Sequence, residues 1–418
     1  MSGPRKRRWL LLLCGVGGLV VCLGIALLYL LGYIYWHRPA IASLTTRDPQ
    51  TLLATADYLA LLGNWQGARP YFAKAERIFA ERGDRRNELY AEVSCVQADV
   101  EKGSYAEAAH YLNQQFSDPA VQGDARLKLR FLTVKGIVDL NTNTIDAERD
   151  WAEALIIAKS LGDITWQTRA TGWLGILDFV NGNSSGAGAK VFSAITQSMW
   201  HHDIGAQIIF MTYLADGLTE DGMPGRGLAA ADRALALVRT NPYTGFPYRT
   251  YIAKISALTA LRRYPEARSL ISSTLNHARE AGILAAQADL LRAAGELEEE
   301  AGNDDRAMDY FWQTAATASQ ARLPRIVGEA MFSLADLLRK KGKLPEAERC
   351  LAQGVDALRQ VEAPYELPHY LAVEAGLKAA EGKFKDADDL FSQAADLVSA
   401  VCSSARRTVH LRERCWER

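Results

Sequence analysis

Three groups of residues in this 418-residue chain have types that could do chemistry. The first is Gly182-Asn183-Ser184-Ser185-Gly186, which satisfies the GxSxG pattern of a hydrolase nucleophile elbow. That pattern exposes a reactive serine only where a strand precedes it and a helix follows it in an α/β sheet. A serine hydrolase is therefore one hypothesis, and it predicts an esterase activity that Ser184→Ala abolishes.

The other two groups are histidine-rich and acidic. His201-His202-Asp203 is the only histidine cluster, but helical metal sites use ligands at i and i+4, and adjacent histidines point to different sides. We expect an exposed pair at a helix boundary. Glu296 and Glu298–Glu300 form an acidic run. Carboxylates do acid–base work only in a shaped, partly desolvated site, so we expect a solvated helix face.

Other signatures of enzymes and cofactor sites are missing. The sequence contains no P-loop pattern and no Rossmann fingerprint. Its six cysteines are scattered without a CxxC pair, which argues against zinc and thioredoxin-like sites. Residues 48–401 carry 37 basic and 47 acidic groups, so an acidic body argues against nucleic-acid binding. We therefore predict no enzyme, no cofactor, no metal and no nucleic-acid partner.

The N-terminal segment predicts a membrane anchor. Residues 9–36 contain no charge, and tyrosine and tryptophan flank the apolar run as interfacial aromatic residues do. Residues 1–8 are a basic segment on the cytoplasmic side, and 37–47 are a linker. The positive-inside bias places the repeat domain on the outer side of the cytoplasmic membrane, which is the periplasm if the cell is Gram-negative. The alternatives are a signal peptide cleaved near Ala40-Ile41-Ala42 and a buried core helix.

The elements that must position any site are set by a long sequence repeat. A small residue recurs in a turn frame, with an apolar or aromatic residue four places later and often another small residue three places after that. These small anchors are Ala68, Ala108, Ala147, Ala187, Gly227, Ala267, Ala307, Ala347 and Ala387. Neighbouring anchors are about 40 residues apart, a period that indicates a repeat architecture. The spacing is constant except for one step that is shorter by a single position.

The repeat frame predicts helical hairpins with a close crossing. A turn glycine such as Gly302 can end a helix in the left-handed conformation. The anchor alanine then lets the second helix approach the first, where another small residue, such as Gly295, precedes the turn glycine by seven places. Unit three is one residue short, which places a deletion in Leu140–Asp146, and residues 241–247 predict a break between units five and six.

This frame resembles the tetratricopeptide repeat (TPR) family over residues 48–400. The resemblance implies an all-α fold: a right-handed TPR-type α-solenoid of about nine helix–turn–helix units after one transmembrane helix. Because the common TPR period is shorter, about 34 residues, we expect the extra residues in longer helices, as in the extended TPR variants of bacterial signalling and regulatory proteins. HEAT-type repeats, of about 40–47 residues, are the alternative.

The resemblance also implies a partner-binding groove on the first helix of each unit. A peptide or protein ligand is expected there. The candidate residues are Tyr90, Val93 and Gln97 in unit two, Arg169, Ile176 and Phe179 in unit four, Arg249 and Ile252 in unit six, and Arg292, Glu296, Asp336 and Arg339 in units seven and eight.

The last segment, 401–418, is basic and breaks from the repeat. It is interpreted either as an interaction tail or as an interruption before a further domain. Residues 391–398 are similar to the junction in bacterial anchored TPR proteins that continue into a caspase-like CHAT domain. The preferred function is a membrane-tethered scaffold or adaptor. The alternative is the regulatory or sensor part of a signalling or protease-type protein whose effector is missing or separate.

Overall fold

The protein is built of helical hairpins. A computed structural model describes residues 41–100, 105–180, 184–359 and 367–401, and these contain helices and no β-strand. The first helices of the units are α2 Pro49–Leu61, α4 Arg85–Val100, α7 Ala125–Thr142, α9 Ile164–Val180, α11 Ile204–Glu220, α13 Tyr248–Ala260, α15 Leu284–Glu300, α17 Pro324–Lys340 and α19 Leu367–Ala380. The second helices are α3 Trp65–Glu81, α5 Tyr105–Gln115, α8 Thr144–Ser160, α10 Ser184–Trp200, α12 Pro224–Thr240, α14 Tyr264–Glu280, α16 Asp304–Gln320, α18 Leu344–Leu358 and α20 Phe384–Val401.

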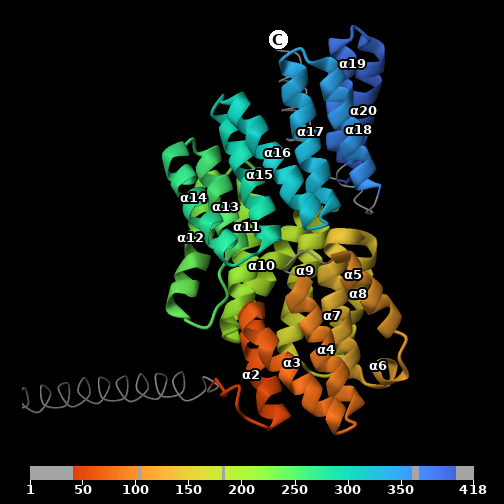
Figure 1. Cartoon of the computed structure of the whole chain (residues 1–418), viewed down its shortest axis with the longest axis vertical. Helices are drawn as coiled ribbons and strands as arrows, with labels where there is room; N and C mark the ends of the chain where they lie inside the picture. The colour runs from red at the N-terminus through yellow and green to blue at the C-terminus, as the bar shows by residue number, and fades with distance from the viewer. Residues whose placement is uncertain (1–40, 101–104, 181–183, 360–366, 402–418) are drawn as a thin grey trace, which may run out of the picture. The chain divides into compact units, whose positions relative to one another are not determined.

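The hairpins stack in chain order. Figure 1 shows them following one another from α2–α3 in red to α19–α20 in blue. Within a unit the two helices pack side by side, and first helices also contact first helices, as α11 does α13 and α13 does α15. The described residues form nine such pairs, so the predicted all-α, TPR-type solenoid of about nine units is confirmed.

Helix length explains the length of the repeat. In unit seven, α15 and α16 each have 17 residues, and the turns 301–303 and 321–323 follow them. Two such helices and their two short turns account for one repeat, so the extra residues do lie in longer helices. The middle turn residue has positive φ, 76° at Gly302 and 56° at Arg322. This left-handed residue closes the helix end, which is why glycine is common there.

The small residues of the repeat lie at the helix crossings. All nine anchors are buried, including the glycine of unit five. Their partners on the first helices are equally tight: a Cβ on Gly136 would lie 2.4 Å from Nε1 of Trp151, and one on Gly295 would lie 2.6 Å from the Phe311 ring. The large residue four places after an anchor therefore fills the space that a missing side chain leaves on the paired helix.

Both predicted irregularities are present. α7 ends at Thr142 and α8 begins at Thr144, so Asn143 alone replaces the longer turn of the other units. Its side chain accepts hydrogen bonds from the backbone N–H groups of Ile145 and Asp146. Residues 241–247 form the longer loop between units five and six. A short helix that was not predicted, α6 Pro119–Gly123, lies between units two and three.

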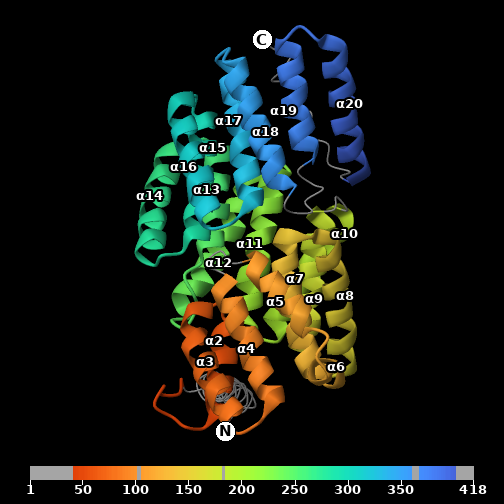
Figure 2. The same cartoon turned by 45° about the vertical axis from the view of Figure 1, so that its right-hand side comes forward.

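Unit one also contacts units far along the chain. The Arg169 guanidinium at the start of α9 donates to the Leu61 carbonyl at 2.7 Å, and Asn64 Nδ2 donates to the Tyr243 carbonyl at 3.0 Å. Figure 2 shows the orange α2–α3 hairpin next to the green end of α12. A second long-range contact is the ion pair between Glu107 of unit two and Arg322 after α16. The spiral therefore touches itself.

The membrane prediction is corrected. Among the residues that the structure describes, no helix combines the length and apolar character needed to cross a bilayer. This finding contradicts the single-pass localisation with the repeat domain outside the cytoplasmic membrane. Residues 9–36, where the span was expected, lie outside the described residues, as do 1–8 and most of the tail 401–418.

Candidate partner-binding groove

A strip of charged side chains crosses the first helices of units five to eight. Arg249, Asp289 and Glu329 occupy one repeat position on α13, α15 and α17, in three consecutive units. Asp216 and Glu296 share a second position, seven places further along the helix. Because i and i+7 lie on one face of a helix, the two positions form a continuous inner strip.

One end of this inner strip is a pair between neighbouring units. The Arg249 guanidinium donates to Asp216 Oδ2 at 2.8 Å, and its centre lies 5.4 Å from the centroid of the Tyr213 ring. The Arg249 side chain is 48% exposed, whereas Asp216 is 15% exposed. The guanidinium therefore sits over a half-buried carboxylate and an aromatic ring, with one side open to solvent.

The other end is a network centred on Arg292. Its guanidinium lies 2.5 Å from Glu296, 3.3 Å from Glu329 and 3.6 Å from Asp289. Arg325 pairs in turn with Glu329. The network joins α15 to α17, and electrostatic interactions also link Asp289 and Arg292 to Arg249.

Burial and neighbouring charges shift the pKa values of several residues in the inner strip and in contact with it. Burial raises the pKa of the Asp216 carboxyl, although the Arg249 guanidinium opposes this. Burial likewise raises the pKa of the Tyr213 phenol. The pKa of Arg249 is raised chiefly by Asp216, and that of Arg292 chiefly by Glu296. Both guanidinium groups are thus fixed positive charges at physiological pH.

Asp336, one repeat after Glu296, forms a further ionic group with Arg339 on α17. Arg339 donates to Asp336 at 2.7 Å, and Lys340 lies 2.9 Å from Asp336 and 2.8 Å from Glu299 of α15. Burial would raise the pKa of Asp336, but Lys340 and Arg339 outweigh it and hold that pKa below its usual range. This group continues the ionic contacts between the first helices of units seven and eight.

Four of the predicted groove residues are buried instead. Val93, Ile176 and Ile252 are at most 4% exposed and belong to the core. They pack in the hydrophobic clusters of the array, so they are not open to a partner. Arg169 is 6% exposed, because its guanidinium is held by Asp203 at 2.7 Å and by the Leu61 carbonyl. It joins unit four to unit one and is not free to meet a partner.

The remaining predicted residues are partly buried. The Tyr90 hydroxyl donates to Asp57 at 3.1 Å, and its ring lies under the Arg130 guanidinium at 5.6 Å. Burial raises the pKa of Asp57 to about 6. Gln97 and Phe179 are half-buried on α4 and α9. The structure therefore brings together Arg249, Arg292 and Glu296, and it does not join them to the unit-two residues.

The three chemical motifs fall in helical surroundings. Ser184 begins α10, which follows α9 in a helical hairpin, so the strand that a nucleophile elbow needs is not its neighbour. His201 and His202 are exposed at the turn after α10, as predicted, and His202 has φ 55°. The expectation of a solvated acidic run was wrong at Glu298, whose side chain is 2% exposed.

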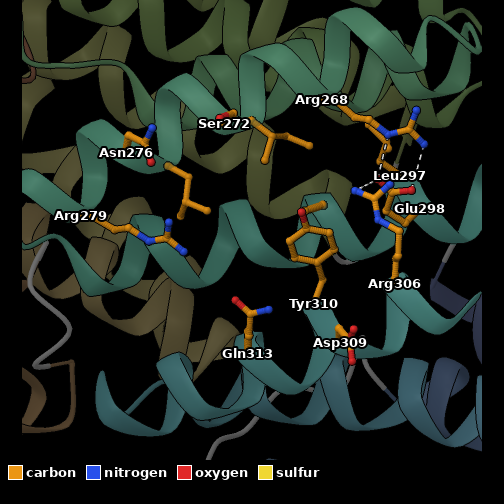
Figure 3. Close-up of a pocket in the computed structure, with 13 residues that line it drawn as sticks. Arg268, Ser272, Asn276, Arg279, Leu297, Glu298, Arg306, Asp309, Tyr310 and Gln313 are labelled. Carbon is orange, nitrogen blue, oxygen red and sulfur yellow. Dashed lines mark hydrogen bonds and ion pairs between the residues drawn. The ribbon is translucent and has the colours of Figure 1, made fainter. Parts of the chain in front are cut away.

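Glu298 lies in a cavity of about 530 Å³ between α14 and α16, with α15 behind it (Figure 3). Arg268 of α14 donates to both carboxylate oxygens at 2.8 and 2.9 Å, and Arg306 of α16 lies 3.2 Å away. Tyr310 points into the cavity from α16 in Figure 3. Because Glu298 connects three helices, we interpret the ionic contacts at this end of the cavity as stabilising the array. We therefore keep the inner strip as the candidate binding site.

The sequence interpretation missed three members of the inner strip and two residues that contact it. These residues are Tyr213, Asp216, Asp289, Arg325 and Glu329. The signal was present, because Asp289 and Glu329 follow Arg249 at the repeat step, and Asp216 precedes Glu296 by twice that step. A comparison of the same repeat position in successive units would have identified these residues, whereas the positions transferred from the TPR family did not include them.

Comparison with known families finds one match. The model of the family described as "MalT-like TPR region" matches residues 212–415. The match begins within α11 of unit five, continues through unit nine and includes the whole inner strip. No curated protein sequence is significantly similar to the chain.

The solved structures that match this chain include three of low sequence identity. The Rap protein complexed with competence and sporulation factor is 14% identical and covers 89% of this chain and 99% of its own, with a TM-score of 0.46. Yeast Tom70 is 13% identical, with coverages of 89% and 88% and a TM-score of 0.47. NprR in complex with its cognate peptide NprX is 14% identical, with coverages of 86% and 98% and a TM-score of 0.46.

Proposed function

We propose that this chain is a binding protein of the tetratricopeptide repeat type, because residues 212–415 match the MalT-like TPR region and the described residues form nine stacked helical hairpins. Its inner strip holds a peptide or a protein segment, and the chain acts as a scaffold or adaptor without a reaction of its own. The ionic strip on α11, α13, α15 and α17 is the observation that carries this proposal.

The charges of the strip suggest the chemistry of the ligand. Arg249 and Glu296 are its most open members, at 48% and 44% side-chain exposure. A segment that carries an acidic group opposite Arg249 and a basic group opposite Glu296 would complement both. Such complementarity sets register and specificity, and the interaction should weaken with salt.

Site-specific photocross-linking tests the proposal. A photoreactive amino acid replaces Ser256, which shares the repeat position of Asp216 and Glu296, in the full chain. The matched control carries it at Ser272, exposed on the second helix α14. We expect protein adducts from position 256 that Arg249→Glu removes. Equal adducts from both positions, or adducts that Arg249→Glu leaves unchanged, would exclude the inner strip as the binding site.

Two alternatives are separated by simple measurements. A regulatory or sensor role would require that binding at the strip changes the activity of an effector, supplied on the same chain or separately. The hydrolase hypothesis requires an esterase activity that depends on Ser184. We expect the purified protein to hydrolyse no activated ester in a manner that Ser184→Ala abolishes.

A further inference from the structure

The outer face of unit four exposes unusually large apolar side chains. On α10, Phe192, Met199 and Trp200 are 67%, 55% and 78% exposed. On the neighbouring second helix α8, Ile145 and Ile156 are each 67% exposed. Exposed apolar patches of several hundred Å² on soluble proteins mark interaction sites.

The other repeats show that this patch is not required by the fold. The residue twelve places after the anchor is basic in units three, five, six and eight: Lys159, Arg239, Arg279 and Arg359. A basic residue near a helix C-terminus interacts favourably with the helix dipole. Unit four has Met199 there and Trp200 next to it, where the other units have residues such as Ser160 and Thr240. Unit four thus has an exposed apolar surface where several other units have a basic residue that favours the helix C-terminus.

The same helix face carries small residues at its other end. Gly188 and Ala189 are exposed in the first half of α10, and Thr196 is half-buried in the second half. With Phe192, Met199 and Trp200 they lie within an arc of about 120° at 3.6 residues per turn. Large side chains therefore gather near the C-terminal end of the stripe, and the smallest gather near its N-terminal end.

If two copies of this stripe pair in antiparallel fashion, the large side chains of one copy lie opposite the small side chains of the other. We propose that the outer stripe of α10 and α8 binds a second copy of this chain, with the two α10 helices antiparallel about a two-fold axis at the level of residue 194. This pairing places Trp200 of one copy over Gly188 of the other, Met199 over Ala189, and Phe192 over Thr196. Two-fold interfaces use one patch twice, so a large side chain must meet a small one in this way.

One pair of residues on α8 and the single charge of α10 fit the same axis. On α8 the axis places Ile156 of one copy opposite the exposed Ala152 of the other. The only charged residue of α10 is Lys190, which pairs with Asp178 of its own chain at 2.7 Å. The antiparallel pairing therefore brings no unpaired like charges of α10 together, whereas on α8 it places the exposed Lys159 opposite the exposed Arg149, which pairs with Asp146 of its own chain.

The area of the patch is enough for a small dimer interface. An aromatic side chain buries roughly 150–250 Å², and the five large side chains are each more than half exposed. Together they offer on the order of 600 Å² per copy, or about 1,200 Å² in a pair, the lower limit of stable interfaces. The dimer is therefore expected to be reversible and concentration-dependent.

The oligomeric state of the full chain tests this proposal. Met199→Arg copies the residue that Arg239 and Arg279 provide in other units, so it suits the helix end and should leave the fold intact. We expect the unmodified chain to be a dimer by light scattering coupled to size exclusion at micromolar concentration. Met199→Arg and Trp200→Ser should both be monomers, while Trp312→Ser, which removes an exposed tryptophan of α16, stays dimeric.

A monomeric unmodified chain would overturn the proposal, as would a Met199→Arg variant that remains dimeric. The axis is tested separately with a short bismaleimide cross-linker. Thr196→Cys lies near the axis and should cross-link to its copy, whereas Ala316→Cys, at the same repeat position on α16, should not. Cross-linking of both variants alike, above the background of the unmodified chain, would rule out the α10 pairing.

Discussion

Single residues in this array are most informative where a charge is buried. Lys135, Asp139 and Asp150 lie at the junction of α7 and α8, and each is at most 6% exposed. The Lys135 ammonium lies 3.3 Å from Asp139 and 3.6 Å from Asp150, so one cation faces two carboxyl groups. Burial raises the pKa of Asp150 to about 7 from its ordinary value of 3.8, and Asp139 adds to this rise.

Asp150 therefore makes stability depend on pH. Since its pKa is higher in the folded protein than in the unfolded chain, the folded protein holds this proton more tightly. Its contribution is fully present below pH 3.8 and is lost progressively as the pH rises from 3.8 through 7. Asp150→Asn keeps the shape of the protonated side chain without the charge. We expect a gain in urea stability that is larger at pH 8 than at pH 5 by on the order of 2 kcal/mol, because the range from pH 5 to 7 lies within this window.

The control for this prediction is Asp146→Asn. Asp146 is partly exposed near the start of α8 and pairs with the exposed Arg149. We expect it to leave the difference between pH 5 and pH 8 unchanged. If Asp150→Asn gained nothing at the higher pH, Asp150 would already be neutralised by Lys135 in the folded protein.

At the scale of the helix, the crossings between paired helices determine which substitutions are tolerated. Glycine inside a helix ordinarily costs about 1 kcal/mol relative to alanine. At Gly136 the missing side chain leaves room for Trp151, which is 1% exposed and stacks on Trp173 at a ring distance of 5.6 Å. The close packing of this ring against α7 therefore outweighs the helix propensity of alanine.

Gly136→Ala is expected to destabilise the protein by about 1–3 kcal/mol, because its Cβ would overlap the Trp151 ring. The matched control is Gly225→Ala on α12, where nothing lies within 4 Å of the added Cβ. That variant should be equal to the unmodified chain or more stable, by less than about 1 kcal/mol. Urea unfolding of the two variants measures the contrast, and equal midpoints would mean that Trp151 shifts at no cost.

The positions of the helices and turns could be predicted from the sequence because the repeats can be aligned with one another. The anchors, the shortened turn at residues 140–146 and the loop at 241–247 follow from spacing alone, because an error in one unit is exposed by the next. α6 was not predictable, since residues 119–123 occupy the positions where the other units end their second helix and turn. Single helices would also have been poor guides, because apolar residues on two sides of first helices such as α9 blur their pattern.

At the scale of the whole molecule, the spiral contacts itself between unit one and residues 241–247. A Cβ on Gly245 would lie 2.4 Å from the Gly63 carbonyl oxygen. This contact joins parts of the chain that stacking alone does not bring together. A simple repeat array is stabilised only within each unit and between nearest neighbours. Here a contact between distant units adds to the stability of the array.

Gly245→Ala should separate these units without disturbing the stacking of neighbours. We expect faster amide hydrogen exchange in α2 and in residues 241–247, and little change in α15–α18. Gly225→Ala serves again as the control. If α2 exchanged at its original rate, packing against α3 and α4 would be sufficient to hold unit one in place.

The candidate site was only partly predictable, because the spiral decides which residues are open. The sequence placed Arg249, Arg292 and Glu296 correctly on first helices. It could not show that Arg169 is buried, since its partner Leu61 belongs to a distant unit. Nor did a frame borrowed from the shorter common repeat transfer to these longer helices, where Val93 and Ile252 turn toward the core.

The equal length of the helices has one more consequence, which concerns the rims of the array. From α8 to α12, and again from α14 to α17, every helix has 17 residues, and successive helices run in opposite directions. Each rim then alternates amino ends, which are partially positive, with carboxyl ends, which are partially negative. These fields largely cancel along the rim, so the backbone attracts neither cations nor anions there. Discrimination between partners is consequently left to side chains, which evolution can vary one unit at a time.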